Sequence, residues 1–169
     1  MSGTAPPWNA RDRSGSLCRL AEWLNDTARQ TLLEDGFHTE LFFLYRADGR
    51  GVISQPPPGL DRDQVAEALR QTIRVNNIYG LVHICEAWTY FPKLPRDHTM
   101  TQILHGEIAV SELRPEDRTE ALTVRMESRD GASRLWMSPI VRTTRGVALS
   151  DAVEWPEPPD GRFAGLFGG

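Results

Sequence analysis

The sequence predicts an α+β domain in which an antiparallel sheet of about five strands is flanked by helices. Two segments, 17–32 and 61–76, repeat apolar residues with helical spacing, whereas 120–128 alternates apolar and polar residues as a half-buried strand does. Two Asp-Gly pairs, at 48–49 and 130–131, mark hairpin turns between apolar runs. The expected order is therefore helix, hairpin, helix and then three or more strands.

The first helix and hairpin have clear boundaries. A serine N-cap, Ser14 or Ser16, and the glycine at Gly36 bound the expected helix. The aromatic run 39–46 then predicts a strand that returns, after the Asp-Gly turn, through 52–54. The triple proline that follows ends the hairpin because proline cannot donate to a strand ladder.

A second helix and a long strand follow. Asp61 and Gln64 form a capping box that opens the helix. The nearly continuous apolar run 79–91 is typical of a central strand covered on both faces. The segment 92–114 shows no clear period, and we expect a long loop there with a short strand near 108–110.

The last strands are expected to form a second hairpin and one further strand. Segment 135–141 is the expected partner of 120–128 in the hairpin, and 147–149 is the expected further strand. Within 120–128, side chains alternate between a core face and a solvated face. The core set is Leu122, Val124 and Met126, and the solvated set is Thr123, Arg125 and Glu127.

Both ends of the chain differ in composition from the middle. Residues 1–14 predict a flexible leader, 15–153 the single domain, and 154–169 a Pro/Gly-rich tail with an apolar end. Aromatic anchors in such a tail favour binding to a protein partner or to a second copy, outside the core of the domain. The expected partner-binding residues are Trp155, Phe163, Leu166 and Phe167.

The composition excludes several classes of partner. The 23 acidic and 19 basic residues are interspersed and give a net charge of −4, so no broad positive field would attract nucleic acid. No apolar run is long enough for a membrane span, and none follows the start of the chain, so we expect a cytoplasmic protein without membrane contact. The two cysteines have no metal-type spacing and are expected to be reduced thiols.

Glu86 is the most unusual residue of the long apolar strand. A buried carboxylate needs a cationic partner, and we expect a structural pair with an arginine such as Arg118 or Arg125. His83 lies three residues before Glu86, a spacing that sends the two side chains to opposite faces of a strand. The pair therefore predicts no metal site, and no cofactor motif is present.

Catalysis has only weak candidates. Cys85 could be a nucleophile if His83 or His98 lay beside it, but its apolar strand favours an inert core thiol. His98 and His105 lie in the segment 92–114, which has no clear period, and either could act with Glu86 in the active site of a small enzyme. Loop polarity explains these two histidines equally well.

Short motifs in the second half of the chain resemble a group of bacterial and phage proteins of unknown function. They are the "EAW" at 86–88, the "P-x-x-R-x-E-A-L" at 115–122 and the Asp-Gly turn at 130–131. The resemblance implies a bacterial or phage source and carries no activity. The order of elements is also similar to that of profilin-like and roadblock-like domains, which implies a flanked antiparallel sheet.

Together these observations favour a non-enzymatic protein-interaction or accessory protein, which could form a homo-oligomer. Two alternatives stay open. One is a small hydrolase-like enzyme that uses Glu86 with a loop histidine, and the other is a sensor that binds a small ligand between sheet and helix.

Overall fold

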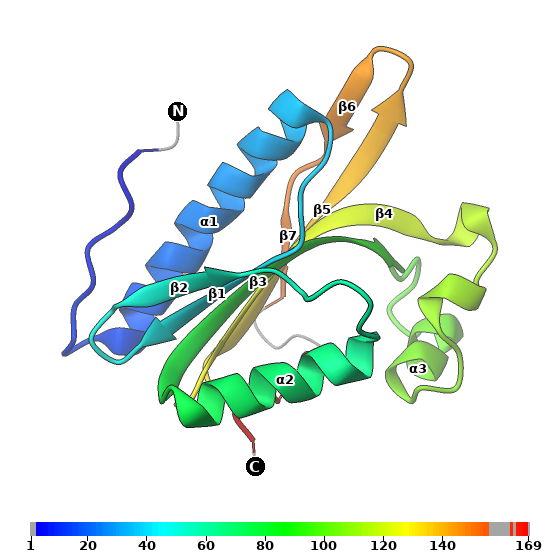
Figure 1. Ribbon diagram of the computed structural model, residues 1–169. Helices are drawn as coiled ribbons and strands as arrows, with labels where there is room; N and C mark the ends of the chain where they lie inside the picture. Colours follow the sequence, from blue (N-terminus) through cyan, green and yellow to red (C-terminus); the bar gives the residue numbers. More distant parts are fainter. Residues whose placement is uncertain (1–2, 156–162, 164, 169) are drawn as a thin grey trace.

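A computed structural model describes residues 3–155, 163 and 165–168. Figure 1 shows a curled antiparallel sheet with a long helix on each face, which confirms the α+β class. The strands follow the order β2-β1-β3-β4-β5-β6, and β7 pairs with β5. They are β1 (Leu41–Arg46), β2 (Gly51–Ser54), β3 (Ile78–Thr89), β4 (Thr119–Ser128), β5 (Ser133–Thr143), β6 (Gly146–Leu149) and β7 (Val153–Trp155).

Helix α1 (Arg13–Asp35) covers one face of the sheet. Its N-cap is Asp12, whose carboxylate accepts a hydrogen bond of 3.1 Å from the backbone of Gly15, so the expected serine cap is wrong. Gly36 ends the helix in the left-handed conformation, with φ of 80°, and donates its N–H to the carbonyl of Leu32 at 2.9 Å.

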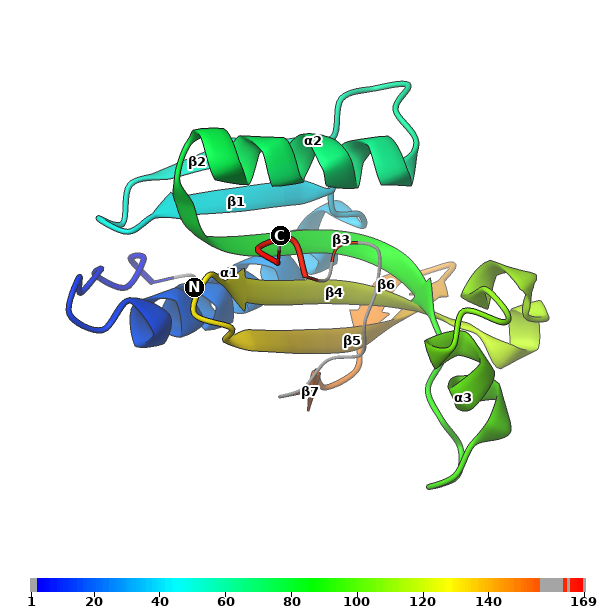
Figure 2. The ribbon, with the colours of Figure 1, turned by 90° about the horizontal axis from the view of Figure 1, so that it is seen from below.

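Helix α2 (Arg62–Val75) covers the opposite face, as Figure 2 shows from below. The predicted capping box is present: the side chain of Asp61 accepts from the backbone of Gln64, and the side chain of Gln64 accepts from the backbone of Asp61. The buried side chains of this helix, among them Val65 and Leu69, pack on Phe42 of β1.

Strand β3 lies at the centre of the sheet, between β1 and β4, and is covered on both faces. Val82 and Ile84 pack in the core under α1, whereas Leu81 packs in the core under α2. At Gly80, a Cβ atom would lie 2.4 Å from the side chain of Leu17, so the glycine allows α1 to approach the strand closely.

The segment between β3 and β4 contains regular structure that the sequence did not reveal. It forms helix α3 (His98–Leu104) and two 3₁₀ turns, η1 (Val110–Glu112) and η2 (Pro115–Asp117), so the short strand expected near 108–110 is wrong. Asp97 caps α3, because its carboxylate accepts from the backbone of Met100 and from the hydroxyl of Tyr90, at 3.1 and 2.7 Å.

The N-terminal segment packs on the domain, in contrast to the flexible leader that was expected. The indole of Trp8 lies against the rings of Tyr45 and Tyr79, and its Nε1 donates to the carbonyl of Ala47 at 3.1 Å. The Nε1 of Trp23 donates to the carbonyl of Gly3 at 2.7 Å. A large aromatic surface that can be buried on the first hairpin explains why this polar segment is ordered.

The C-terminal end also contributes to the core, so the expectation that it stays outside is wrong. Leu166 is only 3% exposed and packs in the core under α2, with Phe163 and Phe167 beside it. Residues 156–162 of the expected tail lie outside the described residues. The core under α2 is therefore completed by the last residues of the chain.

This packing changes the outer face of β4. Leu122, Val124 and Met126 face the core under α1 as predicted, but the opposite face is not solvated throughout. Glu127 is buried, and the backbone N–H groups of 165–167 face its carboxylate. Burial raises the pKa of Glu127, although the nearby Arg125 and those N–H groups act in the opposite direction.

We predict that Val124→Asp unfolds much of the population, because the change places an unpaired charge in a fully buried position at a cost on the order of 3 kcal/mol or more. Val141→Asp is the matched control, since Val141 lies on β5 and is about half exposed. Thermal melts followed by circular dichroism should show a much lower midpoint for the first variant only. Equal midpoints would show that the face of β4 is wrongly assigned.

We also predict that Leu166→Ala destabilises the monomer by about 2 to 4 kcal/mol, the usual loss when a buried leucine is truncated. Leu33→Ala, at an exposed position of α1, serves as the control and should change stability little. Urea unfolding of the two variants measures the difference. A Leu166 variant as stable as the unaltered chain would contradict the packing of the C-terminal end in the core.

Candidate functional site

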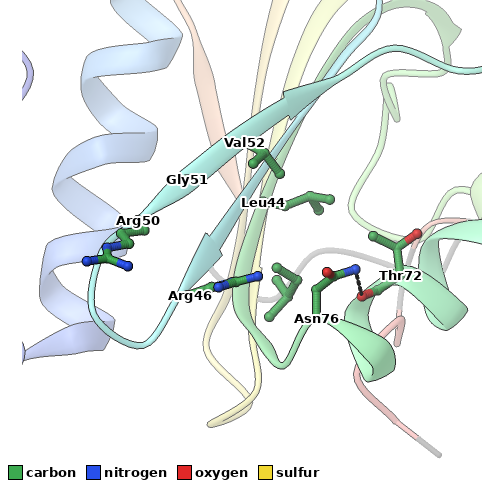
Figure 3. A pocket seen from close by; sticks show the side chains of 8 residues that line it. Leu44, Arg46, Arg50, Gly51, Val52, Thr72 and Asn76 are labelled. Carbon is green, nitrogen blue, oxygen red and sulfur yellow. Dashed lines mark hydrogen bonds between the residues drawn. The ribbon is translucent and has the colours of Figure 1, made fainter.

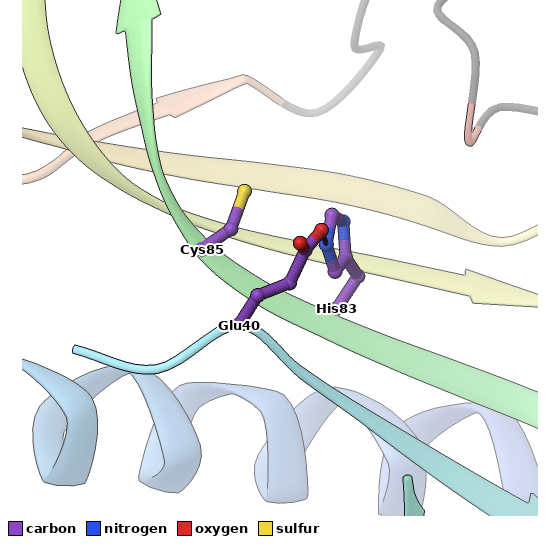
Figure 4. Close-up of side chains that lie close together, drawn as sticks. All are labelled: Glu40, His83 and Cys85. Atoms are coloured by element: carbon purple, nitrogen blue, oxygen red, sulfur yellow. Dashed lines mark hydrogen bonds and ion pairs between the residues drawn. The ribbon is translucent and has the colours of Figure 1, made fainter. Parts of the chain in front are cut away.

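Three side chains of metal-ligating and catalytic types meet on the face of the sheet under α2. His83 and Cys85 are two residues apart on β3, so both point to the same face. Glu40 directly precedes β1, and the pairing of Phe42 with His83 and of Leu41 with Ile84 places it beside Cys85. Figure 4 shows the three side chains pointing toward one another.

The cluster is tight and removed from solvent. The Nε2 atom of His83 lies 2.8 Å from Oε1 of Glu40, and one ligand atom from each of the three residues lies within 4.8 Å of the others. His83 is 5% exposed and Cys85 is 8% exposed. The Sγ atom of Cys85 also contacts Oγ1 of Thr123 on β4, at 3.1 Å.

Aromatic rings and one arginine enclose the cluster. The ring of Phe42 stacks on the imidazole of His83, with centroids 4.4 Å apart, and the ring of Phe163 meets the imidazole edge-on at 4.9 Å. Arg62, at the start of α2, donates to the carboxylate of Glu40, and its guanidinium lies over the ring of Phe163 at 5.7 Å. The C-terminal end of the chain thus forms part of the wall of this site.

The three groups shift one another's protonation. Burial alone would raise the pKa of Glu40, but hydrogen bonds from His83 and Arg62 hold that pKa below its usual value. Burial alone would lower the pKa of His83, but its bonds to Cys85 and Glu40 raise it. Burial also opposes ionisation of Cys85, yet the contact with His83 lowers the pKa of the thiol. The contacts among the three groups therefore shift the pKa of each one in the direction of its charged form, against the effect of burial.

Sequence reasoning found two members of this cluster but not their association. Cys85 is buried in an apolar strand, as expected. It also lies beside His83, which is the arrangement under which the sequence analysis allowed a reactive thiol in place of an inert one. The spacing of two residues between them was the available signal. Glu40 could not be found from spacing, because its position depends on the pairing of β1 with β3.

Glu86 lies on the opposite face of β3 and has a structural role, as predicted, with a different partner. Its carboxylate accepts from Arg142 at 2.5 Å and from the backbone N–H of His38. Arg142 also binds Glu120, and it donates to the carbonyl of Gly36 at the end of α1, at 2.6 Å. The expected partners Arg118 and Arg125 are therefore wrong, and Arg142 joins β3, β4 and α1.

The short motifs of the sequence meet at this end of the sheet. Trp88 of the "EAW" run lies opposite Glu120 of the "P-x-x-R-x-E-A-L" run in the pairing of β3 with β4. The guanidinium of Arg118 lies 4.8 Å from the centre of the Trp88 ring. The two motifs are thus two halves of one cross-strand contact.

The weak catalytic candidates do not come together. His98 is exposed at the start of α3, and His105 follows the end of that helix, with its Nδ1 atom 3.7 Å from Glu107. Among the described residues, neither histidine joins Glu86 in a group of ligand-type side chains. No enzyme site of Glu86 with a loop histidine is supported by this placement.

Of the expected partner-binding residues, Leu166 is buried and Phe163 packs on the cluster described above. Phe167 packs against the same core, and Trp155 lies on β7, paired with Leu135 of β5.

Among the helices that the structure describes, none is long and apolar enough to cross a bilayer.

No family model matches this chain, and neither curated proteins nor solved structures yield a match. The resemblance of the short motifs to bacterial and phage proteins therefore stays a prediction, and the function has to be argued from the site alone.

Proposed function

We propose that the protein binds a divalent metal ion of the zinc class through Glu40, His83 and Cys85. The observation that carries this proposal is the approach of a buried thiol, a buried imidazole and a half-buried carboxylate to within 4.8 Å of one another. Thiolate, imidazole and carboxylate are the three ligand types that zinc prefers in proteins. A thiolate and a carboxylate also balance the double charge of the ion.

The spacing of the three groups fits such an ion after a small adjustment. Tetrahedral zinc holds its ligand atoms about 3.3 to 3.6 Å apart, given bonds of about 2.0 to 2.3 Å. The contact of 2.8 Å between His83 and Glu40 is shorter than this range, and the outer limit of 4.8 Å is longer. Glu40 lies outside the strands and can turn, whereas β3 fixes His83 and Cys85.

The surroundings supply the support that metal ligands require. The stacked ring of Phe42 fixes the plane of the imidazole of His83, and the hydroxyl of Thr123 fixes the position of the sulfur of Cys85. Three protein ligands leave a fourth position around a tetrahedral ion, which a water molecule would fill. The sequence analysis predicted no metal site because it considered His83 only together with Glu86. The side chain of Glu86 lies on the opposite face of β3 from His83.

Cobalt(II) titration of the purified, metal-free protein tests the site, because a cobalt–thiolate bond gives a charge-transfer band in the near ultraviolet. We expect one cobalt ion per chain, displaced by zinc. Cys85→Ser should lose the band, and Cys18→Ser is the matched control, since Cys18 lies on α1, on the other face of the sheet. His83→Gln and Glu40→Gln should weaken cobalt binding at least tenfold.

Thermal melts in chelator show whether each variant is folded before its cobalt spectrum is compared. A folded, unaltered chain that develops no thiolate band with excess cobalt would contradict the proposal. So would a band that survives Cys85→Ser and disappears with Cys18→Ser.

A second candidate function is self-association, and the edge strand β2 favours it. All four residues of β2 are exposed, and the strand, at the end of the sheet, pairs with β1. The backbone N–H of Arg46 donates to the carbonyl of Arg50, so these two residues form a hydrogen-bonded pair of the hairpin. Hydrogen-bonded and non-hydrogen-bonded pairs alternate along an antiparallel ladder, and the backbone N–H and C=O groups of Gly51 and Ile53 therefore point away from β1. Ile53 is itself 65% exposed. An open edge with apolar side chains is a template for another strand.

The pairing that this edge permits is between two copies of β2. An antiparallel arrangement with Val52 opposite Val52 of the second copy would place Gly51 opposite Ile53, so the outward-facing groups of both strands meet. Arg50 would then lie opposite Ser54 of the second copy, and no pair of like charges would face across the junction.

We expect Ile53→Lys to abolish this pairing, because a charged side chain at an edge opposes strand addition. Sedimentation velocity at increasing concentration should show dimers of the unaltered chain and monomers of the variant. Val75→Lys, at an exposed position of α2, is the control. A chain that stays monomeric at high concentration, or a dimer that persists in Ile53→Lys, would exclude this junction.

A further inference from the structure

A cavity of about 540 Å³ lies between the first hairpin and the C-terminal end of α2. Figure 3 shows its walls: Leu44 and Arg46 of β1, Val52 of β2, and Thr72 and Asn76 at the end of α2. The volume falls within the range of small-molecule sites in proteins, about 300 to 1,000 Å³. The cavity shares β1, β3 and α2 with the cluster of Glu40, His83 and Cys85, but none of these three residues lines it.

The floor of the cavity is apolar. Leu44 and Val52 are a cross-strand pair on the face under α2, and Ile78 lies beside them at the start of β3. Leu44 and Ile78 are buried, but Val52 remains 58% exposed.

The rim of the cavity carries two arginines, and only one of them has an acidic partner among the described residues. The guanidinium of Arg46 forms no hydrogen bond or ion pair with any residue that the structure describes. Arg50 lies on the same rim, with Nε 3.5 Å from Asp48, and its side chain is well exposed. The side chains of Thr72 and Asn76 are occupied in part, since each donates to a carbonyl of α2.

We propose that this cavity binds a small amphipathic anion, namely the carboxylate of a medium-chain aliphatic acid. The aliphatic chain would cover Leu44, Val52 and Ile78 and remove the exposed part of Val52 from water. The carboxylate would accept from the free guanidinium of Arg46, a charge-assisted contact that also fixes orientation. The C-terminal end of α2 carries a partial negative charge, which would repel an anionic head group. The positive charges of Arg46 and Arg50 are needed to offset this repulsion.

This site is independent of the proposed metal site and has its own test. Octanoate is titrated into the ¹⁵N-labelled protein, with amide chemical shifts as the readout. Acetate tests the head group alone, and octanol tests the chain alone. We expect octanoate to shift amides of 44–52 and 72–78, with at least tenfold weaker binding of acetate and of octanol.

Two variants locate the ligand, and both change exposed residues, so the fold should be kept. Arg46→Gln should weaken octanoate binding about tenfold while octanol binding stays the same, because only the head-group contact is lost. Val52→Asp should weaken octanoate binding by a similar factor, since it places a negative charge on the apolar floor. Arg74→Gln is the matched control, on the exposed side of α2 and outside the cavity wall.

The proposal is overturned if octanoate binds the Arg46 variant as tightly as the unaltered chain, or if octanol and octanoate bind equally. Shifts confined to other parts of the molecule overturn it too, as does the absence of any shift at millimolar octanoate. Because the titration is done with chelator present, its outcome does not depend on whether the metal proposal holds.

Discussion

The burial of β3 on both faces is the constraint on which the rest of this structure depends. The strand has a neighbour on each side and a helix over each face, so its inner residues have no access to water. An ionisable group in such a place is destabilising by several kcal/mol unless other groups bind it. His83 meets this condition, and Glu86, on the opposite face of the strand, keeps only 19% of its side chain exposed.

The partners of these two residues come from distant parts of the chain and join separate elements. Glu86 binds Arg142 of β5, which also holds Glu120 of β4 and the last turn of α1. His83 binds Glu40, which is in turn held by Arg62 of α2. Each of these two side chains of β3 is therefore linked to one helix, and the two helices are held by different networks.

The unequal length of the two helices explains why the unusual chemistry lies on one face. Helix α1 has 23 residues, whereas α2 has 14 and spans about 21 Å. Under α1 the core is continuous and apolar. Under α2 the helix leaves part of the sheet uncovered, and Phe163, Leu166 and the cavity beside Val52 occupy what remains. Both proposed sites follow from this incomplete cover, and so does the burial of Glu127.

Local patterns in the sequence were enough to predict most of the elements, although not α3 or β7, but not the contacts between them. The helices, the two hairpin turns and the inward face of β4 follow from periodicity and turn residues, which act over a few positions. Glu40 approaches His83 only because β1 pairs with β3 in one register, and Arg142 reaches Glu86 across β4. Leu166 has no periodic pattern around it, since it lies between glycines, so its burial could be seen only in three dimensions.

The charge balance around Glu40 bears on what this cluster can hold. Without a metal ion, Glu40 is shared by His83 and Arg62, and the thiol of Cys85 lies beside the imidazole. With a divalent ion, the carboxylate and the thiolate would neutralise the ion and His83 would be neutral, which leaves the charge of Arg62 to be accommodated. Its side chain is about half exposed, and its guanidinium lies over the ring of Phe163, so water and the aromatic face can stabilise it. The partner that a metal ion would displace is therefore more exposed to solvent than either Glu40 or His83.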